Sequence, residues 1–135
     1  MNIKELNNYL KDLLDNVSYK TSPSYIQAVI LDKDNYKEEF LSSIKISSKK
    51  VKIISTKDSL SDIFNNWLEN DYSLTETVIS SIINKLGEPI KIMSVDKKTL
   101  DNLSCRKYAY CYFYEDMYFV EFKKITICFI LGNNE

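Results

Sequence analysis

The feature that most constrains the fold is the C-terminal stretch, residues 108–131, which is dominated by aromatic and β-branched residues. Residues of these types favour strands, and the stretch divides into three such runs, 108–114, 117–122 and 125–131. The polar pairs between the runs are Glu115-Asp116 and Lys123-Lys124. We therefore expect a three-stranded antiparallel meander with a two-residue turn at each pair.

Two such turns fix the register of the meander. The first places Tyr114 opposite Met117, and the second places Val120 opposite Ile127. Because opposed residues share a face, one face is apolar or aromatic throughout: Ala109, Cys111, Phe113, Tyr118, Val120, Phe122, Ile125, Ile127 and Phe129. The other face carries what we call the tyrosine row, Tyr108, Tyr110, Tyr112 and Tyr114, with Met117, Phe119, Glu121, Thr126, Cys128 and Ile130. A one-residue slip in either turn would scramble this sorting.

The rest of the chain alternates between helical and strand patterns. Apolar residues at helical spacing predict helices over 3–16, over 60–68 after a cap at Asp58 or Ser59, and over 74–86. The last of these has capping-box spacing at Ser73–Glu76 and ends at Gly87. Short apolar runs predict strands at 25–31 and 90–95, with short helices after Asp34 and over 96–103. Residues 44–54 fit either two strands joined by a turn or one bent strand.

The element order predicts an α+β fold. We expect helices packed on one face of a mostly antiparallel sheet that ends in the C-terminal meander. The length of 135 residues corresponds to one domain, spanning residues 1–135, and is enough to bury a core without a metal or disulfides.

Several classes of chemistry lack their usual residues. The chain has no histidine, and its three cysteines, Cys105, Cys111 and Cys128, form no C-x-x-C pair, which argues against a zinc site. A nucleophilic cysteine would lack its common base. Two isolated glycines exclude the glycine-rich loops that bind phosphates and dinucleotides. We therefore expect a protein that is not an enzyme and binds no metal or cofactor.

The net charge and the hydropathy of the chain limit the classes of partner and the cellular location that we expect. A net charge of −1 with a single arginine, Arg106, argues against nucleic-acid binding. No segment approaches the ~18 apolar residues that a membrane span needs, so we expect no membrane partner. The N-terminus does not look like a secretory signal, which favours a cytoplasmic location. The abundance of Lys, Asn, Ile and Tyr is typical of an AT-rich genome, such as that of a bacterium, phage or mobile element.

Two groups of residues are candidates for a binding surface. The tyrosine row is one, because tyrosine is enriched at protein interfaces. The alternative is that tyrosine simply suits a half-exposed strand, or that the N-terminal helix covers this face. The second group is an acidic stretch without a balancing lysine, which either docks a basic partner or is an ordinary solvated helix surface: Asp58, Asp62, Glu69, Asp71 and Glu76.

These features favour a protein-binding module. The most concrete hypothesis is an immunity or inhibitor protein that neutralises a partner protein, such as a toxin, by occlusion. Its contact residues would be the tyrosine row together with Asp62, Glu69 and Asp71. The alternative is a small-molecule-binding regulatory or accessory domain with a pocket between the helices and the sheet.

Overall fold

The computed structural model describes residues 2–18, 24–32, 34–43, 52–103, 105–107 and 110–133. Its five helices are α1 (Ile3–Ser18), α2 (Tyr36–Ser43), α3 (Leu60–Trp67), α4 (Tyr72–Leu86) and α5 (Lys97–Leu103). Its strands are β1 (Ser24–Leu31), β2 (Ile53–Ser55), β3 (Lys91–Val95), β4 (Cys105–Lys107), β5 (Tyr110–Glu121) and β6 (Thr126–Asn133). Of the segment 44–54, whose two interpretations were left open, residues 44–51 lie outside the described residues.

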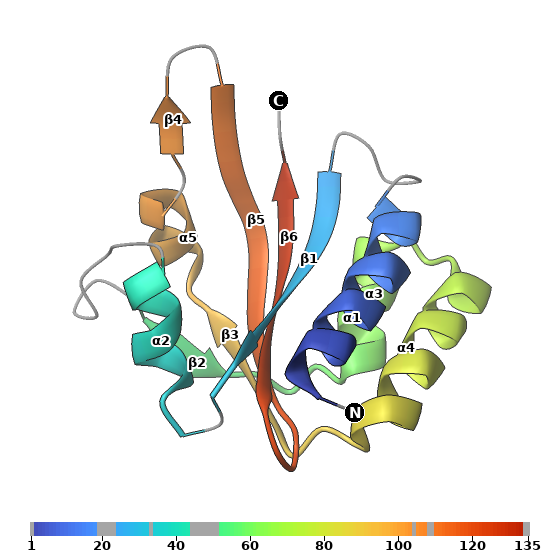
Figure 1. Ribbon diagram of the computed structural model, residues 1–135. Coiled ribbons are helices and arrows are strands. Elements are labelled where there is room, and N and C mark those ends of the chain that lie inside the picture. Colours follow the sequence, from blue (N-terminus) through green and yellow to red (C-terminus); the bar gives the residue numbers. More distant parts are fainter. Residues whose placement is uncertain are drawn as a thin grey trace.

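The strands form one antiparallel sheet in the order β1-β6-β5-β3-β2, and β4 pairs with the first part of β5 (Figure 1). Every strand pair is antiparallel, and the helices lie outside the sheet, so the predicted α+β class is confirmed. The centre of the sheet is the pair β5–β6, which comes from the stretch that dominated the sequence pattern.

The C-terminal meander is confirmed, but its first turn is not where the sequence predicted it. The pairs Val120↔Ile127 and Tyr118↔Phe129 match the predicted register around Lys123-Lys124. The turn predicted at Glu115-Asp116 is wrong, because β5 runs through these residues with a β-bulge between Tyr114 and Asp116. The first strand of the meander is instead β4, which pairs with residues 110–112. A bulge absorbs one extra residue and keeps the strand continuous.

The larger of two cores lies between the sheet and helices α1, α3 and α4. The sheet contributes residues that the sequence pattern assigned to the apolar face: Tyr118, Val120, Phe122, Ile125, Ile127 and Phe129. The helices add the predicted stripes, from Leu6, Leu10, Leu14 and Val17 in α1 to Leu60, Ile63, Phe64 and Trp67 in α3. We call this cluster the major core.

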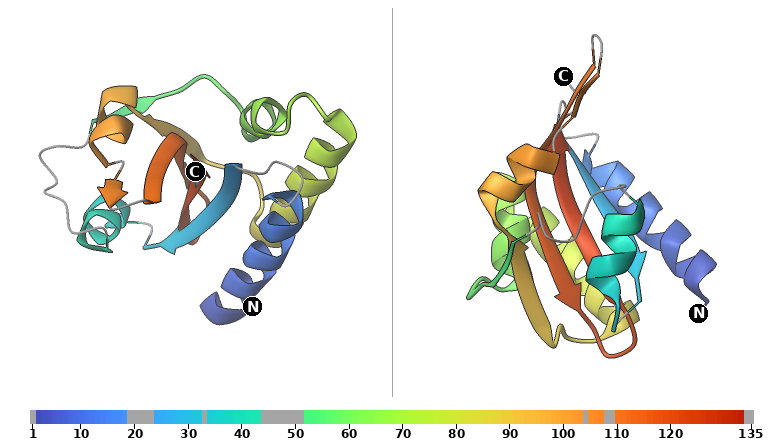
Figure 2. Two further views of the ribbon diagram at one scale, coloured as in Figure 1. Left: turned by 90° about the horizontal axis from the view of Figure 1, so that it is seen from above. Right: turned by 90° about the vertical axis from the view of Figure 1, so that its left-hand side faces the viewer.

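The opposite face of the sheet carries a second cluster, the minor core. Met117, Phe119, Cys128 and Ile130 are buried there against Phe40 of α2 and Leu100 of α5. The large helices cover one face, as expected, and the two short helices extend the helical cover to the other face (Figure 2). The physical reason is visible in β6, whose consecutive apolar residues suit a strand buried on both faces.

Side-chain caps set where two of the helices begin. Ser59 and Asp62 form a reciprocal capping box, in which each side chain accepts a hydrogen bond from the other residue's backbone N–H. Helix α4 begins after Asp71, whose carboxylate accepts from the N–H of Leu74, so the capping box predicted at Ser73–Glu76 is wrong. Gly87, with φ of 81°, ends α4 as predicted.

The glycine at the end of β6 makes room for an aromatic ring from β1. Gly132 lies directly opposite Tyr25 in the sheet register, and a Cβ atom on Gly132 would overlap the Tyr25 ring. We expect Gly132→Ala to lower the free energy of unfolding by about 1–3 kcal/mol, the usual cost of overpacking. Urea unfolding would measure this change. The same substitution in a Tyr25→Ala background should cost clearly less, and equal costs in both backgrounds would contradict the explanation.

Candidate functional site

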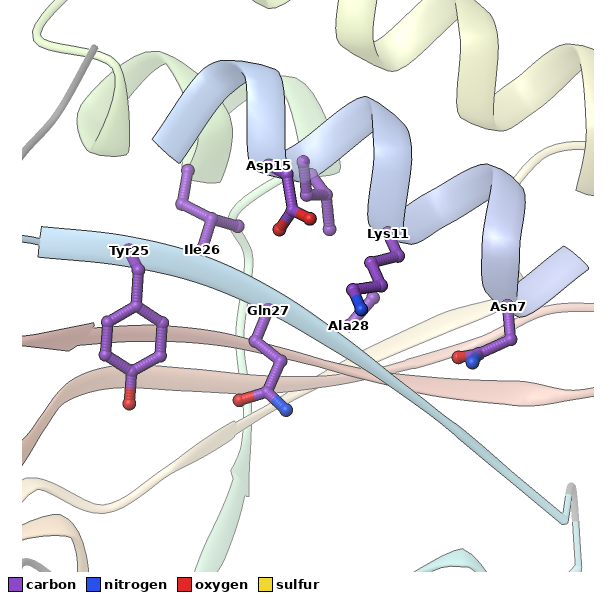
Figure 3. Close-up of a pocket in the computed structure, with 8 residues that line it drawn as sticks. Asn7, Lys11, Asp15, Tyr25, Ile26, Gln27 and Ala28 are labelled. Atoms are coloured by element: carbon purple, nitrogen blue, oxygen red, sulfur yellow. The ribbon is translucent and has the colours of Figure 1, made fainter. Parts of the chain in front are cut away.

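A depression runs between α1 and β1 in the described part of the chain. One hollow, of about 510 Å³, is lined by Lys11 and Asp15 of α1 and by residues 25–28 of β1 (Figure 3). A second hollow, of about 470 Å³, continues along Ile3 and Lys4 of α1 and residues 27–30 of β1. Asn7, Gln27 and Ala28 line both hollows, so the two lie next to each other along α1 and β1 and together make one depression in two parts. We call it the edge groove.

Contacts of α1 with the rest of the helical layer decide which of its sides lines the groove. Tyr9 lies on the side of α4, where its hydroxyl donates to the carbonyl of Ser81 over 3.4 Å and the Lys85 ammonium lies 5.0 Å from its ring centroid. The buried stripe of α1 is turned toward the sheet. The remaining side, which carries Asn7 and Lys11, is directed toward β1 (Figure 3).

The strand that borders the groove is an edge strand of unusual composition. β1 pairs with β6 and stands at one end of the strand order. Its sequence, SYIQAVIL, contains no charged residue, proline or glycine, and Ala28, Val29 and Ile30 are only partly buried. Natural sheets usually blunt their edges with lysine, proline, bulges or very short strands. The opposite edge follows this rule, because β2 has only three residues.

Three members of the tyrosine row, Tyr110, Tyr112 and Tyr114, lie at alternate positions of β5, before its bulge. Tyr108 lies outside the described residues. Tyr110 and Tyr112 belong to the part of β5 that pairs with β4, opposite Lys107 and Cys105. Tyr114 is half-buried and packs against the minor core. Since α1 packs on the major core, it lies on the other side of the sheet from Tyr114 and does not cover it.

The predicted acidic contact residues lie in the layer of α3 and α4. Asp62 is fully exposed, and hydrogen bonds from the backbone and side chain of Ser59 lower the pKa of its carboxyl. Glu69 is exposed in the connection between the two helices with φ of 54°, and Asp71 is the N-cap of α4. These carboxylates therefore lie on the side of the major core, whereas Tyr114 lies on the side of the minor core. Asp62 and Asp71 also have a structural role as caps.

The sequence pattern did not indicate the polar cluster that Asp116 forms with Trp67 and Tyr118. Asp116, at the bulge of β5, accepts a hydrogen bond from the indole N–H of Trp67, with Nε1 and Oδ2 2.9 Å apart. The backbone N–H of Met117 and the side chain of Tyr118 also hydrogen-bond to this carboxylate. Burial raises the pKa of Asp116 against the effect of these bonds. Burial and the carboxylates of Asp116 and Asp58 raise the pKa of Tyr118 to about 12. The cluster joins α3 to the centre of the sheet.

Other chemistry has little support in the described part of the chain. Within it, His, Cys, Asp and Glu residues form no group of three or more that could hold a metal ion. Cys128 is buried, and burial raises the pKa of its thiol well above the ordinary value, which disfavours the reactive thiolate. Among the described helices, none combines the length and apolar character that crossing a membrane requires.

No protein-family model, curated protein or solved structure matches this chain.

Asp71 offers a way to separate a capping role from a binding role. Asn is as good an N-cap as Asp but carries no charge, so Asp71→Asn should leave the free energy of unfolding nearly unchanged. Asp71→Ala should lower it by about 1 kcal/mol through loss of the cap. Thermal unfolding of both variants measures the difference. If Asp71→Asn were as destabilising as Asp71→Ala, capping would not be what this side chain contributes.

Asp116 should show the cost of a half-buried carboxylate. In Asp116→Asn, the amide oxygen can still accept from Trp67 without burying a charge, but the amide NH2 replaces the oxygen that accepts from the N–H of Met117. These two effects oppose each other, so the free energy of unfolding near pH 7 should change by less than about 1 kcal/mol. Asp116→Ala should lower the free energy of unfolding by about 1–3 kcal/mol, because the buried indole N–H loses its partner. Urea unfolding at neutral pH would measure both changes.

The raised pKa of Asp116 also predicts a sign for the pH dependence. The folded state binds this proton more tightly than the unfolded chain. The contribution of Asp116 to stability therefore falls as pH rises from the unfolded-state pKa to the raised folded-state pKa. Asp116→Asn should lack this component in unfolding measurements from about pH 4 to pH 7. Identical pH profiles for the variant and the unmodified chain would contradict the interpretation.

Proposed function

We propose that this chain is a protein-binding module of the immunity or inhibitor type. It binds a partner protein, such as a toxin, and neutralises it by occlusion in the cytoplasm of a bacterial cell. Occlusion needs a complementary surface and no catalytic group, which fits a chain that lacks histidine and glycine-rich loops. We propose accordingly that the protein is not an enzyme.

The observation that carries the proposal is the position of Tyr110 and Tyr112. Both lie in the two-stranded ribbon of β4 and the first part of β5, which extends beyond the rest of the sheet (Figures 1 and 2). A two-stranded ribbon is only marginally stable by itself, and tyrosine combines a large apolar ring with a polar tip. A partner that packs on this ribbon would stabilise it.

The acidic residues supply a second, weaker argument. Asp62, Glu69 and Asp71 are all exposed on the layer of α3 and α4. An exposed group of one charge sign steers a partner of the opposite sign and raises the association rate. A basic partner would therefore be guided toward this side of the molecule.

A second candidate function, binding of a small molecule, is favoured by one observation. The hollow of about 510 Å³ in the edge groove lies between a helix and the sheet and has the volume of a ligand pocket. Ligand pockets are mostly apolar and nearly closed, however, whereas this hollow is bordered by Lys11, Asp15 and an edge strand. A groove of that composition suits a polypeptide better than a small molecule.

The proposal is tested by capture of the partner with matched tyrosine variants. The tagged chain, its Tyr110→Ala/Tyr112→Ala variant and its Tyr110→Phe/Tyr112→Phe variant are used to capture proteins from cells of the source organism, with quantification by mass spectrometry. We expect one protein to be retained by the unmodified chain and the Phe variant, and lost at least about tenfold with the Ala variant. Expression of that protein alone should impair growth, and co-expression of the chain should restore it.

Two results would contradict the proposal. One is the absence of any selectively retained protein, together with a small molecule that co-purifies with the chain. The other is unfolding of the Ala variant while the Phe variant stays folded, as measured by circular dichroism, because the tyrosines would then be core residues.

A further inference from the structure

We infer that the edge groove binds an extended, acidic segment of the partner protein, which adds to β1 as a further strand of the sheet. This inference rests on the proposed protein-binding function and adds a contact outside the ribbon of β4 and the first part of β5. It depends on three properties of the groove: its backbone edge, its apolar margin and its charge.

The backbone edge lies along residues 27–30 of β1. This part of β1 borders the hollow shared with Ile3, Lys4 and Asn7, while its other side pairs with β6. A strand that adds to such an edge gains main-chain hydrogen bonds whatever its sequence, and its alternate side chains give specificity. The contrast with β2 at the far end of the sheet makes β1 the edge better suited to strand addition.

The margin of the groove is apolar at the N-terminal end of α1. Ile3 is 64% exposed although it is a large apolar residue. Across the hollow from it, Ala28, Val29 and Ile30 are only partly buried. Ala28 and Ile30 pack toward the major core and Val29 toward the minor core. An added strand whose acidic residues face α1 would therefore direct its alternate apolar residues to the face of Val29 and bury apolar surface there.

The charge of the groove selects the partner segment. Lys4 and Lys11 line it on the helix side and lie seven positions apart, about 10 Å along the helix axis. In the added strand, acidic residues two or four positions apart on one side would be separated by about 7 or 13 Å. Two flexible lysine side chains about 10 Å apart can reach both of them. Asp15 lies at the Tyr25 end of the groove, so the complementary acidic residues belong toward the other end.

A second copy of this chain fits the groove less well. Its own β1 contains no acidic residue, so pairing of two β1 strands would place none of its own side chains opposite Lys4 and Lys11 as a counter-charge. An acidic segment of a different protein satisfies both lysines and the backbone edge. The occupant is therefore a partner protein and not a second copy.

The test uses synthetic peptides and needs no knowledge of the natural partner. The acidic probe is Thr-Val-Glu-Val-Glu-Val-Thr with blocked ends, and its basic counterpart has Lys in place of both Glu residues. Each is titrated into the full ¹⁵N-labelled chain and followed by NMR. We expect saturable shifts of the amides of residues 27–30 with the acidic probe, and binding at least about tenfold weaker with the basic probe.

Charge-reversed variants connect the preference to the groove. Lys4→Glu/Lys11→Glu should reverse the preference between the two peptides. Lys52→Glu/Lys57→Glu makes the same change in net charge at exposed residues outside the groove, and should leave the preference unchanged. Both variants keep their folds if circular dichroism and thermal unfolding match the unmodified chain.

Three outcomes would overturn the inference: no peptide binding, equal binding of both peptides, or shifts confined to residues outside α1 and β1. Self-association of the unmodified chain through β1, detected by light scattering and abolished by Gln27→Lys, would also overturn it. A negative result in the peptide test and a negative result in the capture experiment contradict different claims. Peptide binding without a captured partner would contradict the proposed function alone, and a captured partner without peptide binding would contradict the groove alone.

Discussion

The structure depends on burial of the β5–β6 pair on both faces. These two strands are paired over residues 113–121 and 126–133, and their side chains alternate between the major and the minor core. The apolar surface that they contribute to each side is the main source of stability for the helices packed there. Both the major core and the minor core contain side chains of β5 and β6, so both helical layers pack on this pair of strands.

The bulge in β5 connects the β5–β6 pair to helix α3. An extra residue between Tyr114 and Asp116 changes which side chains the strand presents beyond that point. It places a carboxylate against the indole of Trp67, on the side of the major core. Burial at this position raises the pKa of that carboxyl, because the charged form loses contact with water. The hydrogen bonds of Trp67, Met117 and Tyr118 offset part of this effect and fix how α3 sits on the sheet.

Local patterns in the sequence predicted much of the fold. The apolar stripes of α1 and α3, the end of α4 at Gly87 and the register around Lys123-Lys124 all follow from short-range rules, and the structure confirms them. The bulge at Tyr114–Asp116 was not predictable, because a polar pair between strands has the same local signature in a turn and in a bulge. The cover of the minor core by α2 and α5 depends on contacts between distant segments, as in the packing of Phe40 against Phe119.

The candidate site was less predictable than the fold. The tyrosine row was found by counting residues, but the edge groove arises only where α1 lies beside β1. The sequence did contain one clue, the absence of charged residues, proline and glycine from SYIQAVIL. That absence becomes informative once the topology places the strand at an edge of the sheet.

The pairing of β1 with β6 has a consequence for the order of events during synthesis. β1 is made about a hundred residues before β6, with Ser24 paired to Asn133. While the ribosome is still translating the intervening residues, β1 lacks its partner β6 and both of its edges are unpaired, and its uncharged sequence offers little protection against association with other chains. Contacts this distant along the chain also slow folding. The nascent chain therefore passes through a period in which β1 is open to association, and chaperone binding at this strand would shorten its exposure.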